Sequence, residues 1–359
     1  MISEKPNIHH KKIKGLDTLR FAAFFSVFIG HATPYWSYGF IYSIHLFFVL
    51  SSFLLTYLVL NELKETGRIS RINFLIRRGL RIYPLYFLVL AVSFIVLPII
   101  SKYSNWHFTL PPNKLTYIFF LSNFDHSDHI FPLKFLWSIS IEEQFYILFI
   151  GLSFFFKKHF YVSIGILLFI YTGFRIYSWL NHLDYFDTWM NPAYYFIHYA
   201  AGMIAARLYF EKKVPSIKKL VWLTSGLLIV SVLMDQNKTI QLFDAIPLSA
   251  FFASLILLIV QMFKYVRINN TVFNITEYLG KYTYGLYVYS GFVIAFVVST
   301  LSIHSTLIRT LIELSILLPL SFLSYHLFEI KFLRLKTAFQ FGKRKTEKKS
   351  VSMSLSKTA

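Results

Sequence analysis

The apolar segment 16–35 contains an arginine and a histidine, Arg20 and His31. In an α-helix, eleven residues make three turns plus roughly 20°, so both side chains lie on one face, about 16 Å apart along the axis. Ionisable side chains inside a bilayer are costly, and each is by default a candidate for function. We therefore predict two layers of chemistry, one at each end of this helix.

Other polar side chains are expected at the depth of His31. His45 lies in the outer half of the next apolar segment, with Ser52 two turns further along its face, and Glu142 and Glu143 lie in the outer half of a later one. A carboxylate can fix the tautomer of a histidine, and a neutral imidazole can take a proton from a hydroxyl. We predict His31 and Glu142 as catalytic residues, and His45, Glu143 and Ser52 as candidates on the acceptor side. Alternatively, the histidines only occupy the membrane interface.

Arginines dominate the opposite layer. The stretch "RINFLIRRGLRIYPLYFL" places Arg77, Arg78 and Arg81 at the entry to the third apolar segment, on the side of Arg20. Guanidinium groups bind phosphate oxygens in a bidentate manner, so we predict that these four arginines bind a phosphorylated donor. The alternative is that the loop arginines only anchor the chain at the cytoplasmic surface.

The elements that must position these residues are membrane helices. Of the 359 residues 56% are hydrophobic and only 15% are charged, which is unusual for a soluble protein. Apolar runs of roughly 20 residues, long enough to cross a bilayer, recur along the chain. The sequence therefore predicts an all-α polytopic membrane protein with about ten transmembrane helices, at 16–35, 39–60, 82–101, 134–156, 160–179, 192–210, 219–234, 244–263, 283–301 and 307–327.

The distribution of basic residues predicts how the chain is oriented in the membrane. If the N-terminus is cytoplasmic, most of the 36 Lys and Arg residues fall in cytoplasmic loops, as the positive-inside rule requires. We therefore expect both termini in the cytoplasm, a bundle over 1–335 and a basic, disordered tail over 336–359. The same asymmetry explains the net charge of +19, so no nucleic-acid partner is expected. The partner implied by composition is the lipid bilayer, and the oligomeric state is open.

The chain has no cysteine, which excludes thiolate catalysis and cysteine metal sites. His31, His45 and Glu142 are metal-ligand types, but their positions on three separate helices are not diagnostic. We predict no metal and no tightly bound cofactor.

Four motifs in the first 150 residues resemble those of the acyltransferase family 3 membrane proteins. The first has the arginine and histidine spacing of Arg20 and His31, in "LDTLRFAAFFSVFIGH". The others are "HLFFVLSSFLLT", "FLIRRGLRIYPLYFL" and "LWSISIEEQFY". The later segments "LGKYTYGLYVYSGF" and "LSYHLFEIKFLRL" are similar to two C-terminal family helices. The sequence departs from the family pattern at His45, at Ser51 to Phe53, at Ser290 and at Lys331.

The resemblance implies an O-acyltransferase in the inner (cytoplasmic) membrane of a bacterium. It implies an acyl-CoA donor, with acetyl as the expected acyl group, bound from the cytoplasm, and a glycan hydroxyl as acceptor on the outer side. His31, oriented by Glu142, would deprotonate the acceptor or carry the acyl group briefly; both routes stay open. The acceptor is open among exopolysaccharide, lipopolysaccharide and smaller sugars. The alternative function is a transporter or flippase for a sugar or lipid-linked substrate, which also uses intramembrane charges.

Overall fold

The computed structural model describes residues 13–33, 37–103, 110–125, 132–133, 135–235, 243–265 and 270–339, and none of these residues forms a strand. The helices are α1 (Leu16–Ala32), α2 (Ser37–Thr66), α3 (Arg71–Ala91), α4 (Leu97–Tyr103), α5 (Lys114–Ile118), α6 (Leu136–Leu152), α7 (Phe160–Leu180), α8 (Tyr185–Met190), α9 (Phe196–Phe210), α10 (Ile217–Asp235), α11 (Ala245–Tyr265), α12 (Thr271–Leu279), α13 (Thr283–Thr300), α14 (Thr306–Ser324) and α15 (Ile330–Leu335). The predicted all-α fold is therefore confirmed for the described residues.

Seven continuous helical segments among the described residues are long and apolar enough to cross a membrane: Tyr42–Thr66, Arg71–Tyr103, Phe160–Leu180, Ile217–Met234, Ala245–Tyr265, Thr271–Thr300 and Thr306–Phe339. Each overlaps one of the ten predicted spans. The other three predicted spans correspond to α1 and α6, with 17 residues each, and to α9, with 15 residues. These helices are too short to count as spans by length alone, although α9 is extended at its start by a 3₁₀ turn, Pro192–Tyr195.

The third segment begins eleven residues earlier than the predicted 82–101. Helix α3 starts at Arg71, continues past Pro84, and joins α4 through the π-helical turn Val92–Val96. Arg77, Arg78 and Arg81 therefore lie within the helix and not in a loop before it. Charged residues lower the hydropathy of this first part. Arginine is nevertheless a good helix former, no proline lies between 71 and 83, and the one glycine there, Gly79, is accommodated within the helix.

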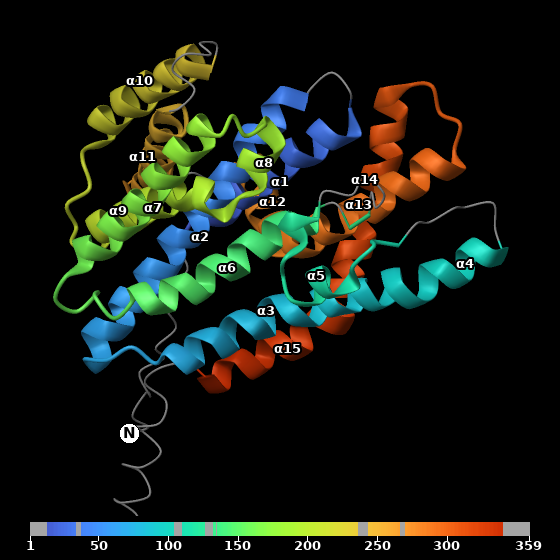
Figure 1. Cartoon of the computed structure of the whole chain (residues 1–359), viewed down its shortest axis with the longest axis horizontal. Helices are drawn as coiled ribbons and strands as arrows, with labels where there is room; N and C mark the ends of the chain where they lie inside the picture. The colour runs from blue at the N-terminus through green and yellow to red at the C-terminus, as the bar shows by residue number, and fades with distance from the viewer. Residues whose placement is uncertain are drawn as a thin grey trace, which may run out of the picture.

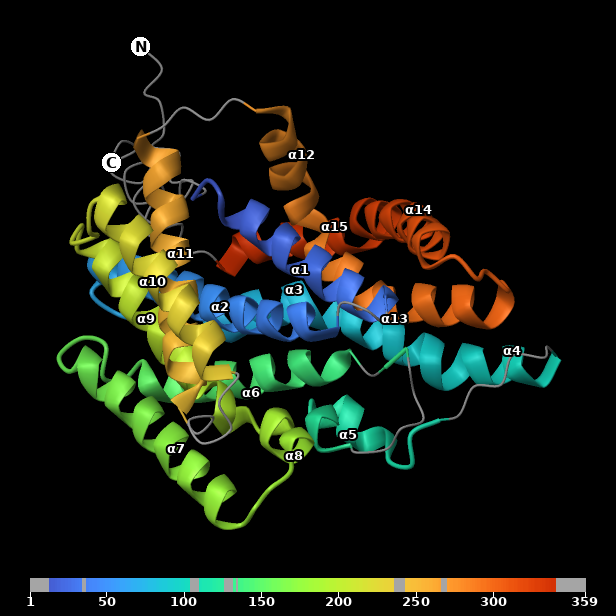
Figure 2. The same cartoon turned by 90° about the horizontal axis from the view of Figure 1, so that it is seen from above.

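Helices α2, α3 and α6 run alongside one another through the middle of the molecule, and α10 lies at its edge (Figures 1 and 2). The exposure of side chains follows this arrangement. Trp222 on α10 is 81% exposed, whereas Phe53 on α2 and Phe145 on α6 are fully buried. The short helices α1, α6 and α9 hold much of the buried core, and longer apolar helices such as α7 and α10 present large side chains outward.

Helices α2 and α9 pack at very short range. A Cβ atom placed on Gly202 of α9 would stand 2.3 Å from the carbonyl oxygen of Val49 on α2. The buried hydroxyl of Ser52 crosses the same interface and donates a hydrogen bond to the carbonyl of Tyr199, at 2.6 Å. The Tyr199 ring in turn stacks on Phe145 of α6, with 3.5 Å between ring centroids. These contacts fix the rotation of α2 about its axis, and thereby which of its side chains face the interior.

The C-terminal helix continues further than predicted. After α14, the π-helical turn Tyr325–Glu329 and α15, a 3₁₀ turn covers Lys336–Phe339. The first four residues of the predicted tail are thus helical. The rest of that tail, 340–359, and the N-terminal residues 1–12 lie outside the described residues, as does the predicted location of both termini.

Candidate active site

A cavity opens between α1, α2, α3, α6 and α13. It contains about 810 Å³ of empty space, part of which is open to the surroundings. Its polar lining side chains are Arg20, Ser51, Arg78, Arg81, Ser138, Glu142, Tyr146, Thr283, Tyr284 and Tyr287. Its apolar walls come mainly from Ile44, Phe47, Phe48, Leu54, Ile82 and Ile139. An apolar pocket with a few converging polar groups is the usual form of a ligand site.

Three of the four predicted donor-binding arginines line this cavity, and they define what we call its basic end. Arg20 donates a hydrogen bond to Asp17 at 2.7 Å. Arg78 lies over the rings of Phe74 and Tyr146, at 5.7 and 6.0 Å from their centroids, and its buried Nε has no hydrogen-bond partner among the described residues. Arg81 interacts electrostatically with both Arg20 and Arg78. Such a group of nearby guanidinium ions favours an anionic ligand.

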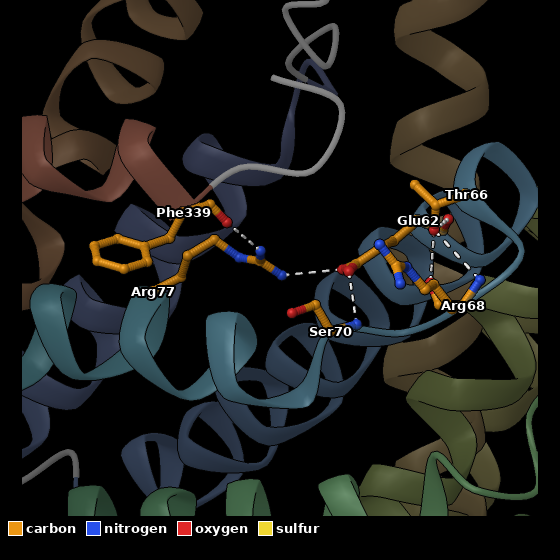
Figure 3. Close-up of polar contacts among 6 residues, drawn as sticks. All are labelled: Glu62, Thr66, Arg68, Ser70, Arg77 and Phe339. Carbon is orange, nitrogen blue, oxygen red and sulfur yellow. Dashed lines mark hydrogen bonds and ion pairs between the residues drawn. The ribbon is translucent and has the colours of Figure 1, made fainter. Parts of the chain in front are cut away.

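The fourth arginine, Arg77, is engaged elsewhere. It donates one hydrogen bond to Glu62 on α2, at 3.2 Å, and another to the carbonyl of Phe339, at 2.8 Å (Figure 3). Glu62 is 1% exposed and also accepts a hydrogen bond from the backbone N–H of Ser70, at 2.8 Å. Arg77 is not among the residues that line the cavity. The structure therefore separates it from the other three.

Glu142 lies in the middle of the cavity. Its Oε1 accepts hydrogen bonds from the hydroxyls of Ser51 on α2 and Tyr146 one turn further along α6. It also interacts electrostatically with Arg20 and Arg78. The negative charge is therefore held by two hydroxyl donors within reach of the basic end.

Two hydroxyl groups, those of Ser138 and Tyr287, form what we call the hydroxyl end of the cavity. They are hydrogen-bonded to each other at 2.7 Å, and the Tyr287 hydroxyl also donates to the carbonyl of Phe135, at 2.9 Å. The ring of His31, in the last turn of α1, packs edge-on against Phe135 with 4.3 Å between ring centroids. His31 thus lies beside the hydroxyl end, one aromatic ring away from the groups that line it.

The predicted contact between His31 and Glu142 stays a prediction. Glu142 uses its hydrogen bonds on Ser51 and Tyr146, and it lies seven residues beyond Phe135, about 10 Å along α6. The prediction placed both residues at one depth because each was assigned to the outer half of its own helix. In the structure, His31 packs against Phe135, the residue just before α6, whereas Glu142 lies further along that helix.

The three candidates for the acceptor side do not line the cavity. His45 is 1% exposed and packs against His198, with 4.3 Å between ring centroids, and against Trp189. Ser52 takes part in the α2–α9 packing described above, and Glu143 accepts a hydrogen bond from Tyr83 at 3.2 Å. Among the described residues, no three His, Asp or Glu side chains are grouped so that they could hold a metal ion.

Several cavity residues were not predicted. Ser138 and Tyr146 flank Glu142 at intervals of four residues, which is the spacing of one helix face and could have been recognised in the sequence. Ser51 is adjacent to the predicted Ser52. Thr283, Tyr284 and Tyr287 come from α13, whose sequence matched the family pattern less well, and nothing in their spacing indicated a role.

The chain matches the family described as "Acyltransferase domain" over residues 13–326. The helical fold, the seven segments long and apolar enough to cross a membrane, and this match together place the protein among the membrane acyltransferases. The chain belongs to that acyltransferase family, which confirms the resemblance found in the sequence. No solved structure matches it.

Among its relatives are three bacterial proteins. The chain is 33% identical over 146 residues to the O-acetyltransferase OatA of Staphylococcus aureus, covering 38% of this chain and 24% of OatA. It is 33% identical over 150 residues to YrhL of Bacillus subtilis, named a "putative peptidoglycan O-acetyltransferase", covering 39% of this chain and 23% of YrhL. A further S. aureus relative, named a "putative O-acetyltransferase", is 32% identical over 183 residues, covering 45% of this chain and 30% of that protein. The matches thus cover less than a third of these relatives, and their names agree with the predicted enzyme class, an O-acyltransferase.

Proposed function

We propose that this protein transfers an acyl group, acetyl in the first instance, from acyl-CoA in the cytoplasm to a hydroxyl group of a glycan on the outer side of the membrane. The observation that carries the proposal is that one cavity is lined both by three arginines at its basic end and by hydroxyl groups beside His31. A phosphorylated carrier with a long neutral arm matches a cavity with cations at one end and apolar walls beyond them.

The donor would bind through its phosphates to Arg20, Arg78 and Arg81. Its pantetheine arm would then lie between the apolar walls, with the thioester near the hydroxyl end. This arrangement requires the basic end to face the cytoplasm, as the distribution of Lys and Arg in the loops favours. We therefore propose that both termini are cytoplasmic and that α1, α6 and α9 complete a ten-helix bundle in the inner membrane of a bacterium.

In the reaction, neutral His31 would take the proton of the acceptor hydroxyl. The hydroxyl oxygen would attack the thioester carbonyl, the carbon–sulfur bond would break, and the CoA thiolate would leave and take up a proton. In the second route, a ring nitrogen of His31 would attack the thioester carbonyl, the carbon–sulfur bond would break and the CoA thiolate would leave. The acceptor hydroxyl would then attack the acyl-histidine, the carbon–nitrogen bond would break, and the hydroxyl proton would end on the released imidazole or the thiolate. In both, the carboxylate of Glu142, which lines the cavity, would stabilise the positive charge that develops on His31.

The acceptor would be a saccharide. Because YrhL carries peptidoglycan in its name, a peptidoglycan fragment is the first acceptor to test, followed by other surface polysaccharides. The sequence departures at His45 and Ser51 to Phe53 lie on α2, beside the cavity, where they would affect the choice of acceptor.

The test is release of free thiol from acetyl-CoA by purified protein in detergent, with and without a sugar acceptor. His31→Ala should abolish acceptor-dependent release while the protein stays folded. Arg78→Ala should raise the KM for acetyl-CoA and leave the KM for the acceptor unchanged, and Arg175→Ala, outside the cavity, serves as the matched arginine control. Full activity of the His31 variant would remove this residue from the mechanism, and sugar transport without thiol release would favour the transporter alternative.

A further inference from the structure

A fourth cation stands at the basic end of the cavity. Lys336, in the 3₁₀ turn Lys336–Phe339, interacts electrostatically with all four arginines of the sequence prediction, including Arg78 and Arg81. It is not among the residues that line the cavity. Its turn is placed against α3 by the hydrogen bond, at 2.8 Å, from Arg77 to the carbonyl of Phe339. Neither its position nor its residue type marks it in the sequence, because it is one of many basic residues near the C-terminus.

Three cations in this group have no ion pair among the described residues. Arg20 is paired with Asp17 at 2.7 Å and Arg77 with Glu62 at 3.2 Å. Arg78, Arg81 and Lys336 form no such pair within 4 Å among the described residues, although Glu142 attracts Arg78 and Glu329 attracts Arg81 at longer range. The cations also repel one another in this partly buried site. Three unpaired cations match a ligand with several phosphate charges better than one with a single charge.

The structure also shows what holds Lys336 in place. The carbonyl of Phe339, in the same turn, accepts a hydrogen bond from Arg77, which is itself fixed by buried Glu62 (Figure 3). Arg77 thus ties the C-terminal turn to α3 and α2. Because Lys336 and Phe339 are one 3₁₀ turn apart, fixing the backbone at Phe339 limits where the lysine side chain can go.

We propose that Lys336 binds a phosphate group of the acyl donor together with Arg78 and Arg81, and that Arg77 is a positioning residue that holds Lys336 in place. The inference rests on the proposed function and adds two roles to it. Lys336 is a fourth donor-binding residue. Arg77, which the sequence predicted to bind the donor, contacts the protein backbone instead. CoA carries a diphosphate and a phosphomonoester, so it has more than one phosphate group to offer these cations.

The first experiment measures the KM for acetyl-CoA in Lys336→Gln, Lys336→Arg and the control Lys331→Gln, which removes an exposed lysine from the same C-terminal segment. Loss of a charge-assisted contact should raise this KM about tenfold in Lys336→Gln. Lys336→Arg should restore it to near the original value, because the charge and donors remain. The kcat and the acceptor KM should not change.

The second experiment tests the role of Arg77. Arg77→Ala is combined with Glu62→Gln so that no unpaired carboxylate remains buried. This double variant should raise the donor KM about as much as Lys336→Gln does. Adding Lys336→Gln to it should have little further effect, because residues that act through one another are not additive.

The results of these experiments distinguish the inference from the proposed function. If Arg78→Ala raises the donor KM and Lys336→Gln behaves like Lys331→Gln, the inference is overturned and the proposed function stands. If neither Arg78→Ala nor Lys336→Gln changes the donor KM, the proposed donor site is itself wrong. A Lys336→Gln variant with lower thermal stability and an unchanged donor KM would show that the lysine serves folding only, and would also overturn the inference.

Discussion

The close packing of α2 on α9 allows a quantitative prediction for Gly202→Ala. The new methyl carbon would stand 2.3 Å from the carbonyl oxygen of Val49, 2.8 Å from Cβ of Ser52 and 3.0 Å from the backbone nitrogen of Phe53. Ordinary contacts of a Cβ atom begin at 3.4 Å, so α2 must move by about 1 Å at Val49. Because two of these atoms belong to a helix backbone, no side-chain rotation relieves the clash.

Overpacking of a well-packed core costs roughly 1–3 kcal/mol, and a clash with backbone belongs at the upper end of this range. The matched control is Gly226→Ala on α10, where an added Cβ meets nothing within 4 Å. There, alanine should stabilise the helix by about 0.5–1 kcal/mol, because glycine is the poorer helix former. The two variants should therefore differ by about 3–4 kcal/mol in the free energy of unfolding.

Thermal unfolding of the detergent-solubilised protein measures this difference. Gly202→Ala should melt well below the unmodified protein, and Gly226→Ala at the same temperature or above. The same shift of α2 would move Ser51 relative to Glu142, so Gly202→Ala should also lose part of the thiol-release activity at temperatures where it is still folded. Equal melting temperatures for both alanine variants would refute the close approach of α2 and α9.

Two further predictions concern the carboxylates of Glu142, which is partly buried in the cavity wall, and Glu313, which is fully buried. Ser51→Ala and Tyr146→Phe each remove one of the two hydrogen-bond donors to Glu142, and we expect each to lower the free energy of unfolding by about 1–3 kcal/mol. The double variant should lose more than the sum of the two single losses, which a double-mutant cycle measured by thermal unfolding would show. Arg309→Ala should cost roughly 1–3 kcal/mol, because Arg309, at 3.8 Å, is the ion-pair partner of the fully buried Glu313 without donating a hydrogen bond to it. Adding Glu313→Gln should restore most of the melting temperature, and no restoration would argue against this pair.

The sequence was a good guide to the helices, because apolar runs of membrane length are hard to mistake for anything else. All ten predicted spans correspond to helices. The main error was the start of α3, because hydropathy alone does not recognise a helix that carries several arginines. One cavity is lined by Arg20, Arg78 and Arg81, which agrees with the predicted layer of arginines. Their role in donor binding stays a prediction.

The details of the site were harder to predict because adjacent residues face different directions on a helix. At each of three neighbouring pairs only one member lines the cavity: Ser51 and not Ser52, Arg78 and not Arg77, Glu142 and not Glu143. In a soluble helix the polar face would show which residue points outward. Here lipid and protein core are both apolar, so only the packing of the helices decides between two neighbours.

Arg20 and His31 stand on one uninterrupted helix, which has a consequence for the choice of carrier. Their separation cannot adjust to the ligand, because α1 has no hinge between them. We expect the protein to select its donor by the length of the arm between phosphate and thioester. A donor with a much shorter arm, bound through the same phosphates, would not bring its thioester within reach of His31. Inserting a single residue between positions 20 and 31 would rotate one group relative to the other by roughly a further 100°, to about 120° apart. We expect this insertion to leave donor binding in place and to abolish acyl transfer.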